Sequence, residues 1–199
     1  MPFFHLDLIS IVKAVGYAGI ALAIFSESGV LFGIFFPGDS LLFTSGLIAS
    51  QGFLNIFILI PLIVVSAILG DTVGYWFGAK VGTRLFTRED SFFFKKRHAE
   101  KTRDFYGKYG TKAVFLSRFI PIIRTIAPIL AGVAKMNYAK FLKYNVAGGI
   151  LWGAGITLIG YFLGSAFPGT QKYLTLIIAV IIVVSFAPII FEIVKRKNK

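Results

Sequence analysis

The stretch AIFSESGVLFGIFFPGDS at residues 23–40 decides the fold of this chain. It is apolar enough to lie inside a membrane, yet it carries Glu27 and Asp39 and is interrupted by Pro37-Gly38. A charge near the bilayer centre costs roughly 2.5–3.5 kcal/mol, even on the insertion scales that give the lowest values. We therefore expect both acids to face protein or water, to have partners of opposite charge, and to mark a functional site.

The expected partners lie in a second stretch, SRFIPIIRTIAP at residues 117–128, which carries Arg118 and Arg124 on either side of Pro121. Asp71 is a fifth charge in an apolar segment, within a row of glycines spaced four residues apart. Such a row lets another helix approach closely. We predict that the glycines serve packing and that Asp71 bonds to a polar neighbour across the contact.

The composition is that of an integral membrane protein. Of the 199 residues, 56% are hydrophobic and only 15% are charged, whereas a soluble domain has about 25% charged residues. Residues 54–79, 144–164 and 172–194 are each long enough to cross a hydrocarbon core, for which about 20 residues suffice. The expected fold class is an all-α integral membrane protein.

Two other apolar segments are interrupted. The stretch 8–36 is followed, after Pro37-Gly38, by only a short apolar run at 40–50, and the segment 113–134 contains two prolines. Segments too short to cross alone are typically re-entrant. Broken backbone at membrane depth is tolerated where it is buried in protein or lines a wet cavity. We predict a re-entrant hairpin at each break.

The two halves of the chain resemble each other. A shift of 86 residues aligns Gly46 with Gly132, Gly74 with Gly160, Tyr75 with Tyr161, Gly78 with Gly164, and Asp39 with Thr125. Asp39 and Thr125 each follow a helix break, where both residue types are good N-caps. We predict two repeats at about 8–82 and 107–164, joined by a linker at 83–106 and followed by the C-terminal span 172–194.

The net charge of +12 is concentrated in the polar segments. Basic residues fill the central loop, the turn at 135–143 and the C-terminus, whereas the turn at 51–55 has no charge. Short basic loops face the cytoplasm, so the central loop and the C-terminus are expected there and the uncharged turn outside. The repeats are then inverted, and paired interrupted segments indicate a transporter's binding site.

This distribution also explains the basic charge without nucleic acid, because anionic phospholipid head groups meet basic loops at the membrane surface. The linker 83–106 mixes aromatic residues with many charges, which predicts an amphipathic helix lying on that surface.

The two breaks predict an anion site. Asp39 or Ser40 after Pro37-Gly38, and Thr125 after Pro121, are expected to cap half-helices whose N-termini converge near the midplane. Unpaired N–H groups and partial positive charge make such termini suitable for phosphate.

Arg118 and Arg124 add planar guanidinium groups that match phosphate oxygens. Glu27 and Asp39 are their expected partners when no anion is bound. The alternative is that these four residues form structural salt bridges between the repeats, although buried ion pairs stabilise proteins poorly. Burial in a low-dielectric cavity favours the neutral carboxylic acid, so Glu27 is expected to exchange protons and couple transport to a proton gradient.

Other chemistries find little support in the sequence. The chain has no cysteine, and its two histidines, His5 and His98, fall in terminal or polar segments, so we expect neither a metal site nor a cofactor. A lipid-phosphate-modifying enzyme needs a nucleophile with a base, or a metal cluster, so we expect no enzyme. An ion–proton exchanger without lipid cargo is the other alternative, but two arginines suit a cation path badly.

Paired motifs occur in order along the chain: Glu27 with FPGDSLL at 36–42, GDTVGYWFG at 70–78, RFIPIIRTIAPILAG at 118–132, and Asn145 with GGILW at 148–152. This pattern resembles the DedA family of bacterial inner-membrane proteins, part of the VTT (SNARE-associated Golgi protein) superfamily. The resemblance covers nearly the whole chain.

The resemblance implies a multi-pass protein of the bacterial inner membrane with two inverted re-entrant hairpins. It also implies a role as a transporter or flippase that moves a lipid, with undecaprenyl phosphate as the cargo returned to the cytoplasmic leaflet. The family's functional positions correspond to Glu27, Asp39, Arg118 and Arg124, all present here. Protons are then a second partner, and an oligomer is compatible with the sequence.

Overall fold

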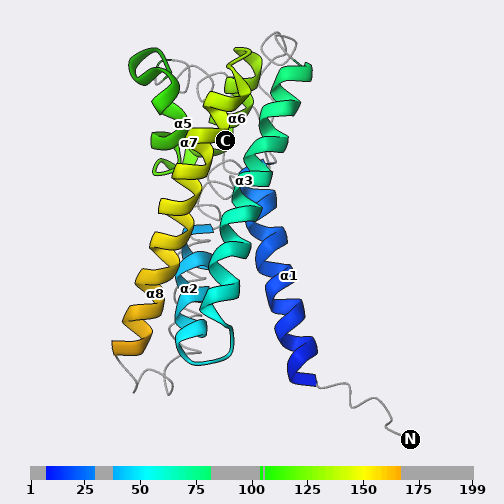
Figure 1. Ribbon diagram of the computed structural model, residues 1–199, viewed down its shortest axis with the longest axis vertical. Helices are drawn as coiled ribbons and strands as arrows, with labels where there is room; N and C mark the ends of the chain where they lie inside the picture. The colour runs from blue at the N-terminus through cyan, green and yellow to red at the C-terminus, as the bar shows by residue number, and fades with distance from the viewer. Residues whose placement is uncertain (1–7, 30–37, 82–103, 105, 167–199) are drawn as a thin grey trace, which may run out of the picture.

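The computed structural model describes residues 8–29, 38–81, 104 and 106–166. Within these ranges the chain is helical and contains no strand, as predicted (Figure 1). The helices are α1 (Leu8–Gly29), α2 (Gly38–Ser50), α3 (Ile56–Val81), α5 (Ala113–Ser117), α6 (Pro121–Val133), α7 (Tyr138–Gly149) and α8 (Gly155–Ala166), with a 3-10 turn η3 (Gly110–Lys112) and a π-helical turn η4 (Ile150–Ala154).

Two long helices run the length of the molecule. One is α3, and the other is the continuous helix Tyr138–Ala166 that α7, η4 and α8 form together (Figure 1). Both are long and apolar enough to cross a membrane, as predicted for 54–79 and 144–164, although the second begins six residues earlier. The predicted span 172–194 lies outside the described residues, as does nearly all of the linker 83–106.

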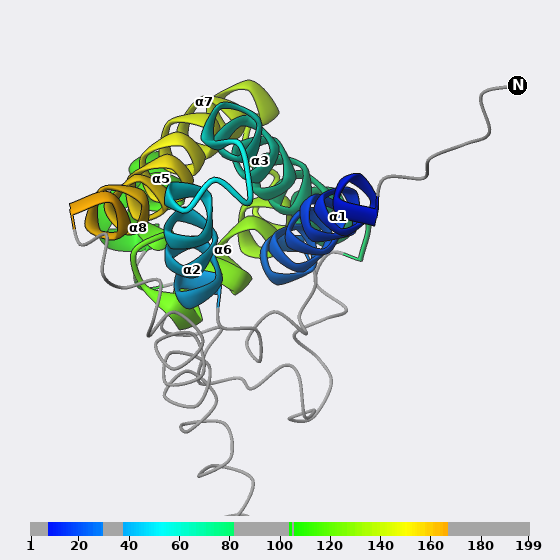
Figure 2. The same cartoon turned by 90° about the horizontal axis from the view of Figure 1, so that it is seen from below.

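The other helices cover only half of that length. In Figure 1, α1 and α2 lie in the lower half and α5 and α6 in the upper half. Helices α2 and α6 have 13 residues each. At about 1.5 Å per residue such a helix is roughly 20 Å long, which is short of the hydrocarbon thickness of about 30 Å. Seen along the long axis, α2 lies between α1 and α8 (Figure 2).

Each short helix packs against a long one through a glycine. A Cβ at Gly46 of α2 or at Gly132 of α6 would overlap backbone atoms of the facing helix. These atoms are the Thr157 carbonyl oxygen and Tyr161 nitrogen at Gly46, and the Tyr75 carbonyl oxygen and Ala79 nitrogen at Gly132. The contact of α2 with α8 is therefore built like the contact of α6 with α3.

The long helices contribute matching glycines to the same contacts. Gly160 of α8 lies against the carbonyl group of Phe43, and Gly78 of α3 lies against that of Ile129. Ile129 follows Phe43 by 86 residues, but Gly160 follows Gly78 by 82. The alignment of Gly74 with Gly160 is therefore wrong by about one helical turn, because a single shift of the sequence cannot reveal the four residues that the second half lacks.

We expect these glycines to resist substitution. Gly160→Ala should destabilise the protein by about 1–3 kcal/mol, the usual effect of overpacking, since its methyl group would meet the Phe43 carbonyl. Gly155→Ala on the same helix is the matched control, because nothing lies within 4 Å of its Cβ position. Thermal unfolding in detergent should show a lower midpoint for Gly160→Ala alone. Equal midpoints for the two variants would contradict the close contact.

Two apolar clusters fill the two halves of the molecule. One includes Ile24, Leu42, Leu59 and Ile63, and the other is formed by Tyr75, Val114, Ala131 and Phe141. Along α3 the first cluster ends at Ala67 and the second begins at Tyr75. Asp71 lies between them, so a polar layer separates the two apolar halves.

Candidate functional site

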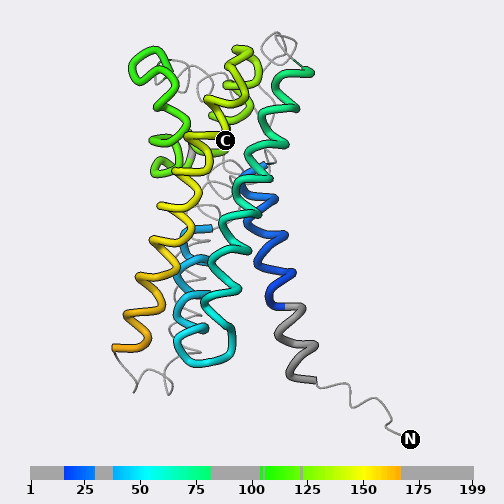
Figure 3. Tube along the Cα trace, in the orientation of Figure 1, coloured from blue at the N-terminus to red at the C-terminus, as the bar shows by residue number. Residues whose placement is uncertain are grey.

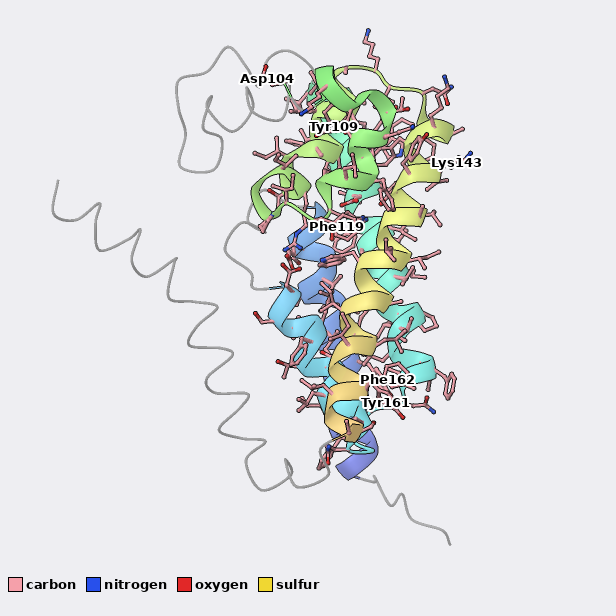
Figure 4. The ribbon with its side chains drawn as sticks, turned by 90° about the vertical axis from the view of Figure 1, so that its left-hand side faces the viewer. Asp104, Tyr109, Phe119, Lys143, Tyr161 and Phe162 are labelled. Atoms are coloured by element: carbon pink, nitrogen blue, oxygen red, sulfur yellow. The ribbon has the colours of Figure 1, made fainter. Side chains whose placement is uncertain are left out.

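The polar layer collects charged side chains from helix ends. Glu27 comes from the end of α1, Asp39 from the first turn of α2, Arg118 from the C-cap of α5 and Arg124 from the first turn of α6. In the tube representation, the C-terminal end of α1, the start of α2 and the break between α5 and α6 all lie near mid-height (Figure 3). Phe119, within that break, is likewise at mid-height (Figure 4).

The break between α5 and α6 has a local cause. A residue that precedes proline is disfavoured in the α conformation, and Ile120 before Pro121 is extended, with φ −122° and ψ 106°. Pro121 then occupies the first helical position, where its missing N–H is no loss. The break places Arg118 and Arg124 on separate helices and lets them point to different partners.

Arg124 bonds to two carboxylates. Its Nη1 donates to Asp39 Oδ1 at 2.7 Å, and its Nη2 donates to Glu27 Oε1. The side chains of Glu27 and Arg124 are 1% and 8% exposed, whereas that of Asp39 is 50% exposed. One arginine thus balances one buried acid and one acid that reaches the surface.

Glu27 also lies against the N-terminus of α2. A Cβ at Gly38 would overlap the Glu27 carboxylate, so only glycine leaves room for it. The partial positive charge of a helix N-terminus favours an anion at this position. The glycine of the predicted break therefore allows the acid to approach the helix end.

Arg118 belongs to a second network. Its Nη2 donates to Asp71 Oδ2 and to Asn145 Oδ1, both at 2.5 Å, and these groups are almost fully buried. Asn145 in turn donates to the carbonyl oxygen of Ile68 at 3.2 Å.

The prediction that Asp71 bonds to a polar neighbour across the glycine contact is confirmed. The expectation that Glu27 or Asp39 pairs with Arg118 is wrong, because Arg118 pairs with Asp71 of α3 instead.

Trp152 touches both networks, and the sequence indicated no role for it beyond its place in a motif. Its Nε1 donates to Asp39 Oδ1 at 2.8 Å, and its ring centroid lies 4.8 Å from Cζ of Arg124 and 5.7 Å from Cζ of Arg118. Asn145 was also given no role beyond its place in a motif. A polar amide in the middle of an apolar span was the sequence signal for it.

The caps predicted at Asp39 or Ser40 and at Thr125 are not confirmed, because these residues lie inside the helices. Helix α6 begins at Pro121 with Ile120 as its N-cap and has no side-chain cap. Thr125 lies four residues inside α6 and is 3% exposed, so its predicted capping role is wrong. In α2, Asp39 lies in the first turn, followed by the partly buried Ser40. Pro37 lies outside the described residues.

Several polar atoms of the site have unused hydrogen-bonding capacity. Glu27 Oε2, Arg118 Nε and Arg124 Nε are buried without a hydrogen-bond partner. Each such atom carries a desolvation penalty of about 1–3 kcal/mol. Within the described ranges, no group of three or more His, Cys, Asp or Glu side chains could hold a metal ion. The site is suited to binding an anion through Arg124.

Comparison with known proteins gives consistent matches along most of the chain. A family model of the VTT domain matches residues 36–162. Protein DedA of Escherichia coli (strain K12) is 42% identical over 184 residues, which are 92% of this chain and 84% of that protein. An uncharacterized membrane protein of Mycobacterium tuberculosis is 41% identical over 189 residues, 94% of this chain and 82% of the relative.

A more distant relative is an uncharacterized membrane protein of Synechocystis, 32% identical over 164 residues, which cover 81% of this chain and 74% of the relative. No solved structure matches the chain.

Proposed function

Because the chain belongs to the DedA family of VTT-domain membrane proteins, we propose that it is a flippase that moves a lipid phosphate between the leaflets of the bacterial inner membrane. The proposed cargo is undecaprenyl phosphate, as the family resemblance implies. The observation that carries the proposal is Arg124, which is shared between the buried Glu27 and the half-exposed Asp39. An intramembrane arginine with one displaceable partner is suited to exchanging a carboxylate for a phosphate.

The proposed fold consists of two inverted repeats, each with a re-entrant hairpin. The short lengths of α2 and α6 support it, as do the equivalent glycine contacts that these helices make with α8 and α3. Half-length helices from opposite sides meet at the polar layer, where transporters of this type bind their substrates. The central loop and the C-terminus then face the cytoplasm, where basic segments meet anionic phospholipids.

In the proposed mechanism the phosphate enters from the side of Asp39 and replaces Asp39 as the partner of Arg124. The guanidinium offers a planar pair of donors to phosphate oxygens, and Nε of Arg124 has no other partner. Ser40, beside Asp39 in the first turn of α2, adds a hydroxyl near the phosphate. The lipid tail stays in the bilayer, and the hairpins exchange exposure between the two leaflets.

Arg118 has a different role in this proposal. The two side chains that bond to it, Asp71 and Asn145, are buried and belong to the long helices. We assign Arg118 to holding α5 against α3 and α7, so that the break carrying Arg124 keeps its position. Of the residues expected from the sequence to bind the phosphate, Arg124 and Ser40 keep this role in the proposal, whereas Arg118 and Thr125 do not.

Proton binding at Glu27 supplies the coupling. When Glu27 is neutral, Arg124 loses one anionic partner and its affinity for phosphate rises, since an opposite charge competes with the ligand for the same guanidinium.

The Glu27→Gln variant is expected to lose the dependence of transport on an imposed pH gradient, because glutamine neither binds nor releases a proton near neutral pH. The measurement is leaflet exchange in liposomes with and without the gradient. Asp104→Asn is the control, because this acid is exposed at the upper end of the molecule, away from the site (Figure 4). Undiminished gradient dependence in Glu27→Gln contradicts the coupling.

Reconstitution of the purified protein in liposomes with labelled undecaprenyl phosphate tests the function itself. Leaflet exchange of the intact lipid is the expected result. Release of inorganic phosphate would instead identify a lipid-phosphate-modifying enzyme. Proton-coupled ion flux without lipid exchange would identify an ion–proton exchanger. Either of these outcomes overturns the proposal.

A further inference from the structure

The π-helical turn η4 interrupts the second long helix at the level of the charged site. It spans Ile150–Ala154 and contains Trp152, which is 2% exposed. Turns of this kind are rare and occur frequently at functional sites. Ile150–Ala154 contains no proline, the residue that commonly interrupts a helix.

The turn packs tightly against α3. A Cβ at Gly153 would lie 3.0 Å from Ile63 Cγ2, and one at Gly149 would lie 3.2 Å from Ile68 Cγ1. The long helices therefore approach each other closely on both sides of Trp152. This close approach fixes the backbone that carries the indole ring and directs the ring into the polar layer.

Two donors converge on one oxygen atom at this place. Asp39 Oδ1 accepts from Arg124 Nη1 at 2.7 Å and from Trp152 Nε1 at 2.8 Å. The ring of Trp152 also lies below the Arg124 guanidinium, with 4.8 Å between Cζ and the ring centroid. The position of this oxygen is thus defined by two elements, α6 and η4, that do not belong to the helix carrying Asp39.

The indole and the Arg124 guanidinium together favour an anionic acceptor at this position. The N–H group of the indole donates and cannot accept, so it bonds to a carboxylate or a phosphate oxygen but not to a cation or a donor. Asp39 is the member of the site that can leave, because its side chain is 50% exposed. An oxygen of another anion placed where Oδ1 now lies would receive the same two hydrogen bonds.

We propose that Trp152 is a substrate-binding residue, whose indole N–H donates to Asp39 at rest and to the lipid phosphate when the phosphate replaces Asp39 at Arg124. This inference rests on the proposed function and adds a binding group to it. The aromatic face keeps Arg124 oriented during the exchange, and the N–H supplies one of the phosphate's hydrogen bonds.

The first test is spectroscopic and leaves Trp152 intact. The chain contains two tryptophans, and Trp76, which is 51% exposed on α3, is outside the site. In the Trp76→Phe protein the emission comes from Trp152 alone. We expect it to shift when undecaprenyl phosphate is added in detergent micelles and to stay unchanged with the neutral alcohol undecaprenol. Unchanged emission in a sample that demonstrably binds undecaprenyl phosphate overturns the inference.

The second test separates a binding role from a packing role. Trp152→Phe keeps an aromatic ring for Arg124 but removes the N–H donor. We expect the apparent KM for undecaprenyl phosphate to rise about tenfold, the effect of one hydrogen bond to a charged group, with little change in the maximal rate of leaflet exchange. A merely structural role would lower thermal stability and the yield of active protein while leaving KM unchanged, and that result overturns the inference.

The two proposals can fail separately. If the wild-type protein moves undecaprenyl phosphate while Trp76→Phe shows no spectral response and Trp152→Phe keeps its KM, only the role of Trp152 is wrong. If the wild-type protein neither binds nor moves the lipid phosphate, the proposed function is wrong and the role of Trp152 is wrong with it.

Discussion

The Arg124→Gln variant is expected to lose leaflet exchange of undecaprenyl phosphate. Arg124 contributes two or more charge-assisted hydrogen bonds to the phosphate in our account, at about 1.5–3 kcal/mol each, so transport should fall by roughly 100-fold or more. The same substitution leaves Glu27, which is 1% exposed, without its cation. Removing one member of a buried pair costs about 3–5 kcal/mol, so this variant should also be unstable.

The double variant Glu27→Gln/Arg124→Gln separates the two effects. It removes both charges of the buried pair and replaces them with groups that can bond to each other, so thermal stability in detergent should recover. Transport should not recover, because no guanidinium remains to hold the phosphate. A stable double variant that transports at the wild-type rate would mean that the pair serves only to join the helices.

The Asp71→Asn variant is expected to have a large effect on the stability of the protein, without removing a group that binds the phosphate. It leaves Arg118, 2% exposed, as an uncompensated buried cation, and the destabilisation should again be about 3–5 kcal/mol. The protein should then be recovered in low yield with a reduced unfolding midpoint. Transport should fall in proportion to the folded fraction.

The matched double variant Asp71→Asn/Arg118→Gln should restore both stability and transport. Amide groups at these positions can still bond to each other and to Asn145, which accepts from Arg118 in the native protein. Recovery of transport is the reverse of the result expected for the Arg124 pair. If the double variant is stable but inactive, Arg118 contacts the lipid phosphate directly and our assignment of roles is wrong.

Much of the fold could be predicted from the sequence because the signals are local. Apolar length predicted the spans at 54–79 and 144–164, which the structure confirms as α3 and most of Tyr138–Ala166. Pro121 predicted a break because of its own geometry and its effect on Ile120. The pairing of Arg124 with Glu27 and Asp39 also followed from charge alone, since these residues had few alternatives.

The choice of partners within the site depended on helix rotation and register, which local sequence does not specify. Arg118 lies six residues before Arg124, on the other side of the break, and faces Asp71 on α3 rather than the acids of the first two helices. The cap predicted at Thr125 was wrong because proline at the first position of α6 makes the helix begin four residues earlier.

Trp152 was missed for a related reason. Tryptophan in a membrane protein usually indicates an interface position, and its proximity to Asp39 depends on a π-helical turn. No periodicity in the sequence predicts such a turn, since it adds a single residue to an otherwise regular helix. The tight packing of Gly153, in this turn, against Ile63 is a tertiary contact that the sequence does not predict.

The most direct measurement is the binding of undecaprenyl phosphate to the purified protein by native mass spectrometry, with undecaprenol as the uncharged competitor. Our account predicts a lipid-phosphate adduct on the wild-type protein and on Asp71→Asn/Arg118→Gln, and none on Glu27→Gln/Arg124→Gln. Equal binding to both double variants, or equal binding of the phosphate and the alcohol to the wild-type protein, would contradict a phosphate site at Arg124.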